Sequence, residues 1–168
     1  MSHRYTLHRS WLGNGGVVNF IMLNPSTADD TIDDATIRRC VGFAKRWGYS
    51  GIVVTNLFAY RATQPSDLKA LLRTEGGFRE AYGEENTSHV DREARMAHLV
   101  VLAWGDNATS LPEIARNIPQ DIMKMLDYRY LYCIRTSKKG NPVHPVREEY
   151  TSEPVLFRVA AVEPITKH

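Results

Sequence analysis

Four short stretches carry the side chains that could do chemistry, and each of them follows an apolar run. They are Leu23–Asp30, Thr55–Arg61, Ala103–Asn107 and Gly140–Pro145. In open α/β sheets, ligands bind in the loops that leave the carboxyl ends of the strands. The four stretches therefore predict one site, assembled from four loops at one edge of a sheet.

The first stretch contains the tripeptide Asn24-Pro25-Ser26. An Asn amide both donates and accepts hydrogen bonds, so Asn24 could orient a water molecule or bind the edge of a base. Pro25 would fix the backbone of the loop. The alternative interpretation is a turn followed by a helix cap, because Asn, Ser and Asp serve that purpose in many proteins.

Asp29, Asp30, Asp33 and Asp34 form the densest acidic cluster of the chain. Carboxylates at this spacing could hold Mg²⁺, which prefers oxygen ligands and often takes only one or two carboxylates. Acidic residues before a helix also stabilise its positive end, and this is the stronger interpretation. A general base remains open as a third role, with Asp29 as the candidate.

The second stretch combines an arginine with aromatic side chains. Arg61 follows the strand end at Asn56, with Phe58 and Tyr60 between them. Arginine can clamp a phosphate while a neighbouring ring stacks on a base. The alternative is that Phe58 and Tyr60 belong to the core, where large aromatic side chains are common.

The last two stretches offer a glycine and a histidine. Gly105 follows Trp104 and would let a ligand approach the backbone, although a plain turn explains the glycine nearly as well. His144 lies between Pro142 and Pro145 in a loop that should be stiff. Its imidazole could donate a proton or a hydrogen bond to developing negative charge.

Composition limits the class of protein. The chain has 168 residues, 43% hydrophobic and 24% charged, with a formal charge of +2, which is ordinary for a soluble globular protein. Residues 1–150 are expected to form one domain, and 151–168 a C-terminal extension with an added strand and a frayed end. We see no signal peptide and no apolar run near the ~20 residues of a membrane span, which predicts a cytoplasmic protein without a membrane.

Cofactor motifs are missing from the sequence. Cys40 and Cys133 are isolated, and the six histidines have no zinc-ligand spacing. The sequence also lacks the dinucleotide-binding glycine motif, the Walker loop and the Gly-x-Ser-x-Gly motif of serine hydrolases. We therefore predict no resident metal and no cofactor.

The apolar periodicity predicts alternating strands and helices. Strands are expected at Val17–Leu23, Ile52–Thr55, His98–Ala103, Tyr130–Ile134 and Val155–Val159, with Arg4–Ser10 pairing to Val17–Leu23 as a hairpin. Helices are expected at Asp34–Trp47, Ser66–Arg73, from Asn86 or Ser88 to Ala97, and at Ile114–Leu126, with a mobile lid or surface loop at Thr74–Gly83. The pattern predicts an α/β fold, a three-layer sandwich around a mainly parallel central sheet.

These motifs resemble a known family. LNPSTAD (Leu23–Asp29), DDATIRRC (Asp33–Cys40), WGY (Trp47–Tyr49), VTNLFAYRAT (Val54–Thr63), AWG (Ala103–Gly105) and GNPVHP (Gly140–Pro145) are similar to the domain-of-unknown-function family 1643. The motifs occur in order from about Val17 to Pro145. The family name implies no established activity.

A more distant resemblance is to the uracil-DNA glycosylase superfamily, whose members carry Asn-Pro or Asp-Pro after the first core strand and a His-Pro motif that closes the site. The matching positions are Asn24-Pro25, Thr55-Asn56-Leu57 with Arg61, Leu102–Gly105 and His144-Pro145. The resemblance implies that Asn24 orients the attacking water, that Asn56 reads a flipped base and that His144 stabilises charge on it. Ser26 departs from the glycine of mismatch-type members, and Val146 and Arg147 depart from the small residues of the intercalating loop.

Together, the residues and the resemblance lead us to expect an enzyme or binding protein that recognises a nucleobase or nucleotide, free or in nucleic acid, with glycosylase-like hydrolytic or base-modification chemistry. The alternatives are a non-catalytic module that binds nucleic acid or protein, and a Mg²⁺-dependent hydrolase or phosphotransferase using Asp29–Asp34. The candidate catalytic residues are Asn24, Asp29 and His144. The candidate substrate-binding residues are Pro25, Ser26, Asn56, Phe58, Tyr60, Arg61, Trp104 and Gly105.

Overall fold

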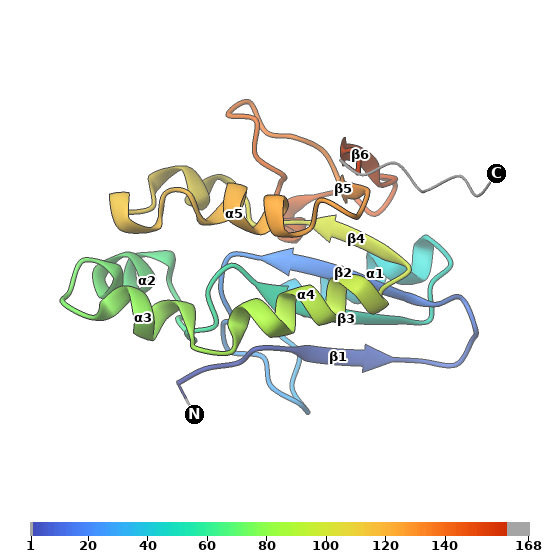
Figure 1. The fold of residues 1–168 in the computed structure, drawn as a ribbon. Coiled ribbons are helices and arrows are strands. Elements are labelled where there is room, and N and C mark those ends of the chain that lie inside the picture. Colours follow the sequence, from blue (N-terminus) through green and yellow to red (C-terminus); the bar gives the residue numbers. More distant parts are fainter. Residues whose placement is uncertain (1, 161–168) are drawn as a thin grey trace.

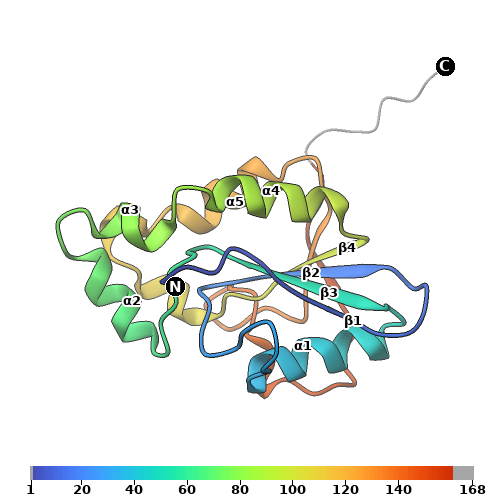
Figure 2. The ribbon, with the colours of Figure 1, turned by 90° about the horizontal axis from the view of Figure 1, so that it is seen from below.

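A single sheet with helices on both faces organises the chain (Figures 1 and 2). The computed structural model describes residues 2–160. The strands are β1 (Leu7–Ser10), β2 (Val17–Met22), β3 (Gly51–Asn56), β4 (Leu99–Leu102), β5 (Leu131–Cys133) and β6 (Val155–Arg158). The helices are α1 (Ala35–Arg46), α2 (Pro65–Leu72), α3 (Gly77–Tyr82), α4 (Asn86–Met96) and α5 (Ile118–Met125), with short 3₁₀ turns η1 (Asp106–Ser110), η2 (Glu113–Ala115) and η3 (Pro145–Arg147).

The sheet is mixed, with the strand order β1-β3-β2-β4-β5-β6. The pairs β3–β2, β2–β4 and β4–β5 are parallel, whereas the edge strands β1 and β6 are antiparallel to their neighbours. The α/β class is confirmed, but the prediction of a mainly parallel sheet is wrong. The buried apolar runs indicated the inner strands. The edge strands β1 and β6 are partly exposed, and their sequences do not indicate whether they pair parallel or antiparallel.

The predicted hairpin between Arg4–Ser10 and Val17–Leu23 is also wrong. Strand β1 pairs with β3, with Leu7 opposite Val54, because both edges of β2 are already taken by the parallel strands β3 and β4. The backbone N–H of Trp11 donates to the Ser50 carbonyl at 3.0 Å and fixes this path.

The parallel register brings the strand ends to one edge of the sheet. Met22 of β2 lies opposite Asn56 of β3, and Ile21 lies opposite Leu102 of β4. The loops that leave β2, β3 and β4 therefore begin side by side, as predicted for the first three polar stretches.

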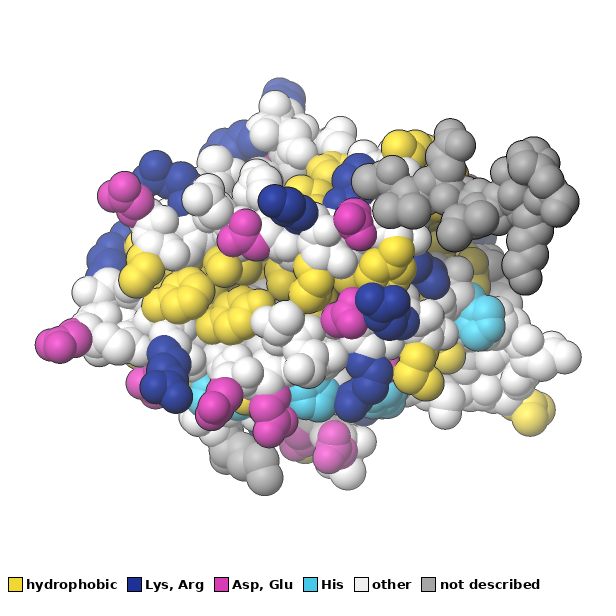
Figure 3. Space-filling view, viewed as in Figure 1, with side chains coloured by type: hydrophobic (Ala, Val, Ile, Leu, Met, Phe, Trp, Pro, Cys, Tyr) yellow, Lys and Arg dark blue, Asp and Glu magenta, His cyan; other side chains and the backbone are white. Residues whose placement is uncertain are grey.

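Side chains of β2 alternate between two cores. Phe20 packs in the cluster that contains Phe43 of α1, whereas Ile21 packs in the cluster that contains Val90 of α4 and Ile122 of α5. Figure 2 shows α1 on one face of the sheet, α4 and α5 on the opposite face, and α2 beyond the end of the strands. In Figure 3, a band of hydrophobic side chains crosses that second face between α5 and the helices α3 and α4.

Helix α1 is confirmed, with ends within one residue of the predicted Asp34–Trp47. The Asp34 carboxylate accepts a hydrogen bond from the Ile37 backbone N–H at 2.9 Å and caps the first turn. The chain leaves the helix at Gly48, whose φ of 85° lies in the left-handed region.

Three other helical segments differ from their predictions. Thr74–Gly83 contains α3, although its glycines indicated a lid or loop. Helix α4 begins after Glu85 without a side-chain cap, and neither Asn86 nor Ser88 caps it. Helix α5 starts later than the predicted Ile114, because Pro119 belongs in a first turn, where its missing N–H costs nothing.

The predicted strand at Val155–Val159 is confirmed as β6, in which Val155 pairs with Cys133 of β5. The predicted frayed end lies outside the described residues. In the part of the chain that the structure describes, no helix combines the length and the apolar character that crossing a membrane requires.

Candidate functional site

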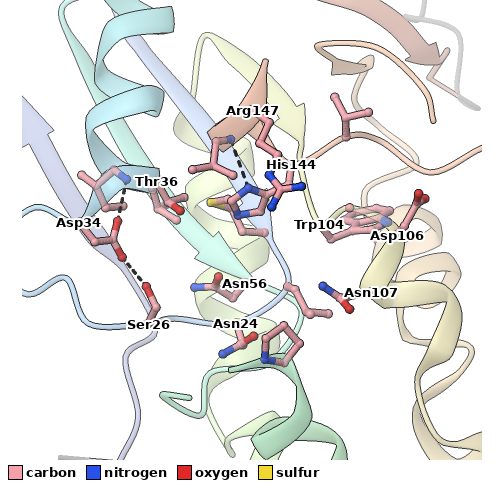
Figure 4. A pocket seen from close by; sticks show the side chains of 18 of the residues that line it. Asn24, Ser26, Asp34, Thr36, Asn56, Trp104, Asp106, Asn107, His144 and Arg147 are labelled. Atoms are coloured by element: carbon pink, nitrogen blue, oxygen red, sulfur yellow. Dashed lines mark hydrogen bonds between the residues drawn. The ribbon is translucent and has the colours of Figure 1, made fainter. Parts of the chain in front are cut away.

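A pocket of about 840 Å³ opens at the carboxyl ends of the parallel strands (Figure 4). All four predicted loops contribute to its lining, through Asn24, Asn56, Trp104 and His144 among others. Its floor is buried, with Asn56 1% and Trp104 3% exposed. The register of the sheet explains why residues so far apart in the sequence meet here.

Asn56 occupies the floor with an unpaired amide. Neither its Oδ1 nor its Nδ2 has a hydrogen-bond partner among the described residues. Its main chain is held firmly, because the Asn86 Nδ2 donates to the Asn56 and Leu57 carbonyls at 3.0 and 3.1 Å. A buried polar group without a partner costs free energy. Asn56 is thus positioned by the fold and left free to bind something else.

His144 has one ring nitrogen available to bind a ligand in the pocket. The backbone N–H of Val146 donates to His144 Nδ1 at 3.2 Å. In the neutral ring this leaves the proton on Nε2. Burial lowers the pKa of His144, against the opposing charge of Asp34. His144 is therefore a neutral hydrogen-bond donor near pH 7.

Gly105 joins the third loop to the fourth. Its backbone N–H donates to the Pro142 carbonyl at 2.8 Å, and its φ of 71° favours glycine. The preceding Trp104 lines the pocket next to it. The contact fixes Trp104 and His144 relative to each other.

Asn24 and Ser26 both line the pocket. The Asn24 Nδ2 donates to the Pro25 and Ala62 carbonyls at 2.9 and 3.0 Å, which fixes the side chain. The Ser26 hydroxyl donates to the Asp34 carboxylate (Figure 4). These bonds order the first loop against the second loop and against the start of α1.

The acidic cluster separates in space. Asp34 lines the pocket, whereas Asp29 does not, and the Asp29 carboxylate accepts hydrogen bonds from the Thr31 and Ile32 backbone N–H groups. Asp33 forms an ion pair with Arg9 at 2.8 Å. In the described part of the chain, no three His, Cys, Asp or Glu side chains gather in a way that could hold a metal ion.

Asp34 is ionised. Burial opposes its charge, but hydrogen bonds from Ser26 and Ile37 and the charge of Arg4 lower its pKa overall. Both carboxylate oxygens already accept hydrogen bonds, Oδ1 from Ile37 and Oδ2 from Ser26.

Four predicted substrate-binding residues lie outside the pocket lining. Phe58 is fully buried in the core, and Tyr60 packs edge-on against His3 with ring centroids 6.2 Å apart. The Arg61 Nη2 donates to the Ala28 carbonyl at 3.1 Å. Pro25 is buried, and its carbonyl accepts the Ala62 N–H at 3.0 Å. These residues support the loops through contacts outside the pocket.

Sequence reasoning missed three arginines of the pocket. Arg4 precedes β1 and donates to the Ala28 carbonyl, and burial together with Arg61 lowers its pKa to about 10. Arg135 and Arg147 lie in the loop after β5, on either side of the Gly140–Pro145 motif. The sequence positions of Arg135 and Arg147, close to His144, could have indicated that they belong to the site. Nothing in the sequence indicated Arg4.

Comparison with known proteins identifies the family of the chain. Residues 4–146 match the family described as "Protein of unknown function (DUF1643)", which confirms the first resemblance. No curated protein and no solved structure matches the chain, and the glycosylase resemblance gains no support from them. Because the match covers most of the sequence, the chain belongs to the DUF1643 family of proteins of unknown function.

Proposed function

We propose that the pocket recognises a nucleobase or nucleotide, through Asn56 as the group that reads the base. The observation that carries this proposal is the unpaired Asn56 amide, 1% exposed in the floor of the pocket. An amide offers one acceptor and two donors in a plane, which matches the adjacent donor and acceptor atoms on the edge of a base.

Two neighbours of Asn56 support a flat, polar ligand. Trp104 adds an aromatic side chain to the pocket floor beside Asn56, and stacking of a base on an aromatic ring is worth about 1–3 kcal/mol. The Nε2–H of neutral His144 would donate to a carbonyl oxygen of the base. The ligand would thus meet a ring, an amide and one further donor, a combination that suits a nucleobase.

The proposed chemistry is hydrolysis of an N-glycosidic bond. Water would attack the anomeric carbon, the carbon–nitrogen bond would break, and its electron pair would stay on the base. His144 would stabilise the negative charge of the leaving base, and Asn24 would orient the water. Asp34 would accept the proton of the attacking water, the general-base role predicted for Asp29, because Asp34 is the carboxylate of this cluster that lines the pocket.

A non-catalytic binding function is the second candidate, and the state of Asp34 favours it. A carboxylate with a lowered pKa and two accepted hydrogen bonds is a weak base for activating water. Ligand binding without turnover would then be the whole activity. Incubation of a bound nucleoside with the protein separates the two candidates, because only hydrolysis releases free base.

A thermal-shift panel of bases, nucleosides, nucleotides and short single-stranded DNA tests the proposal. A true ligand at a hundredfold excess over its Kd stabilises the fold by about 2.7 kcal/mol, which raises Tm by roughly 5–10 °C. The shift should vanish in Asn56→Ala and persist in Asn14→Ala, an exposed asparagine outside the pocket. No shift with any member of the panel would refute the proposal.

A further inference from the structure

The pocket is large for a base alone. Its volume of about 840 Å³ falls in the range of ~300–1,000 Å³ typical of pockets that enclose whole drug-sized ligands. A base on Asn56 would fill only the floor. The remaining space lies toward the rim, so the rim must match the rest of the ligand.

Six charged side chains line the pocket. Two of them, Arg4 and Asp34, already have hydrogen-bond partners in the Ala28 carbonyl and in Ser26 and Ile37. Arg135, Arg147, Asp106 and Glu148 line the outer part of the pocket, and the two arginines are exposed. In Figure 4, Arg147 is drawn next to His144, whereas Asp106 is drawn next to Trp104. The charges of the rim therefore have to be considered one by one.

Three of the four rim charges already have partners. Arg135 binds Glu148 through two hydrogen bonds of 2.8 and 2.7 Å. The Asp106 Oδ1 accepts hydrogen bonds from the Ser137 hydroxyl and the Asn141 amide. The Asp106 contacts hold the fourth loop against η1, and all three charged groups are left with little capacity for a ligand.

Arg147 is the exception. No carboxylate in the described part of the chain forms an ion pair with its guanidinium, and none of its side-chain atoms takes part in a hydrogen bond there. It lies one 3₁₀ turn after His144, in η3, so it belongs to the same short segment as the proposed base contact. A guanidinium binds phosphate oxygens through paired, charge-assisted hydrogen bonds.

We infer that the ligand is a nucleoside phosphate, with its base on Asn56 and its phosphate on Arg147. This inference rests on the proposed function and names the class of ligand within it. The phosphate could belong to a free mononucleotide or to a strand of nucleic acid, because both present the same ester oxygens. The arginine predicted for phosphate, Arg61, is instead engaged with the Ala28 carbonyl.

Calorimetric titration with a matched series tests the inference. The series is a base, its nucleoside, its 5′-monophosphate and a short single-stranded oligonucleotide containing it, at fixed salt. The monophosphate should bind roughly tenfold to a hundredfold tighter than the nucleoside. Arg147→Gln should abolish that gain and leave the nucleoside Kd unchanged. Arg116→Gln, at an exposed position outside the pocket, should keep the gain.

The outcomes are distinct. Equal affinity of nucleoside and monophosphate, or a gain that survives Arg147→Gln, would overturn the inference and leave the proposed function intact. Binding of no member of the series would refute the proposed function and this inference together. Tighter binding of the oligonucleotide than of the monophosphate, lost in Arg147→Gln, would support the inference and identify nucleic acid as the source of the phosphate.

Discussion

A Cβ atom on Gly105 would stand 3.2 Å from the Cβ of His144. Two loops that follow different strands thus approach so closely that a side chain at position 105 would crowd His144. The hydrogen bond from the Gly105 N–H to the Pro142 carbonyl holds them there. The position of the His144 ring in the pocket depends on this contact.

Gly105→Ala should therefore weaken both the fold and the site. The backbone at 105 has φ 71° and ψ −175°, a conformation that costs other residues about 1–3 kcal/mol. The new methyl group would also push His144 aside. Gly140→Ala is the matched control, because its φ is 82° and a Cβ there meets open space. Urea denaturation should show a loss of stability for both variants, whereas titration should show weaker ligand binding for Gly105→Ala alone.

We expect that Asn56 lowers the stability of the fold and that its amide serves ligand binding instead. Replacement by Leu removes an unpaired buried amide, so the free energy of unfolding should stay level or rise. Asn19→Leu is the control: the Asn19 Oδ1 is also unpaired, but its Nδ2 donates to the Val53 carbonyl at 3.1 Å, and the loss of that hydrogen bond should cost about 1–3 kcal/mol. A comparable loss in Asn56→Leu, measured by urea denaturation, would show that Asn56 has a structural partner.

His144 should make stability depend on pH. Burial lowers its pKa below the ordinary 6.5, so the unfolded chain binds the proton more readily than the folded chain. Its contribution to stability is fully present above pH 6.5 and is lost as pH falls toward the folded pKa. His144→Gln should reduce the difference in unfolding free energy between pH 7.5 and pH 5. An unchanged difference would contradict the assigned pKa direction.

Asp34 should tolerate one substitution and not another. Asp34→Ala removes the cap of α1 and should lower the free energy of unfolding by about 0.5–2 kcal/mol. Asp34→Ser keeps an oxygen that can accept the Ile37 N–H and should retain most of that stability. If Asp34 serves as the base in the proposed hydrolysis, the Ser variant should bind ligand and fail to release product. Turnover by Asp34→Ser would exclude Asp34 from that role.

The central strands and the first helix could be predicted because local sequence patterns determine them. Continuous apolar residues marked β2, β3 and β4, and the Asp34 cap and Gly48 marked the ends of α1. The partner of β1 could not be predicted, since it depends on which edges of β2 the parallel strands occupy. Helix α3 was missed because local glycines at 76, 77 and 83 outweighed its short apolar face.

The site was predictable to the level of loops and not of side chains. Strand ends placed Asn24, Asn56, Trp104 and His144 at one edge, and all four line the pocket. Whether a loop side chain turns inward depends on contacts made across the fold. Arg61 turns to the Ala28 carbonyl, and the Asp29 carboxylate turns to its own loop.

The most direct test of the central claim is a crystal structure of the protein soaked with a nucleoside that shifts its Tm. The proposal predicts the base in the pocket floor, its edge within hydrogen-bond distance of both amide atoms of Asn56, and a carbonyl oxygen on His144 Nε2. A nucleoside bound away from Asn56, or an Asn56 amide left without a ligand contact, would contradict the proposal.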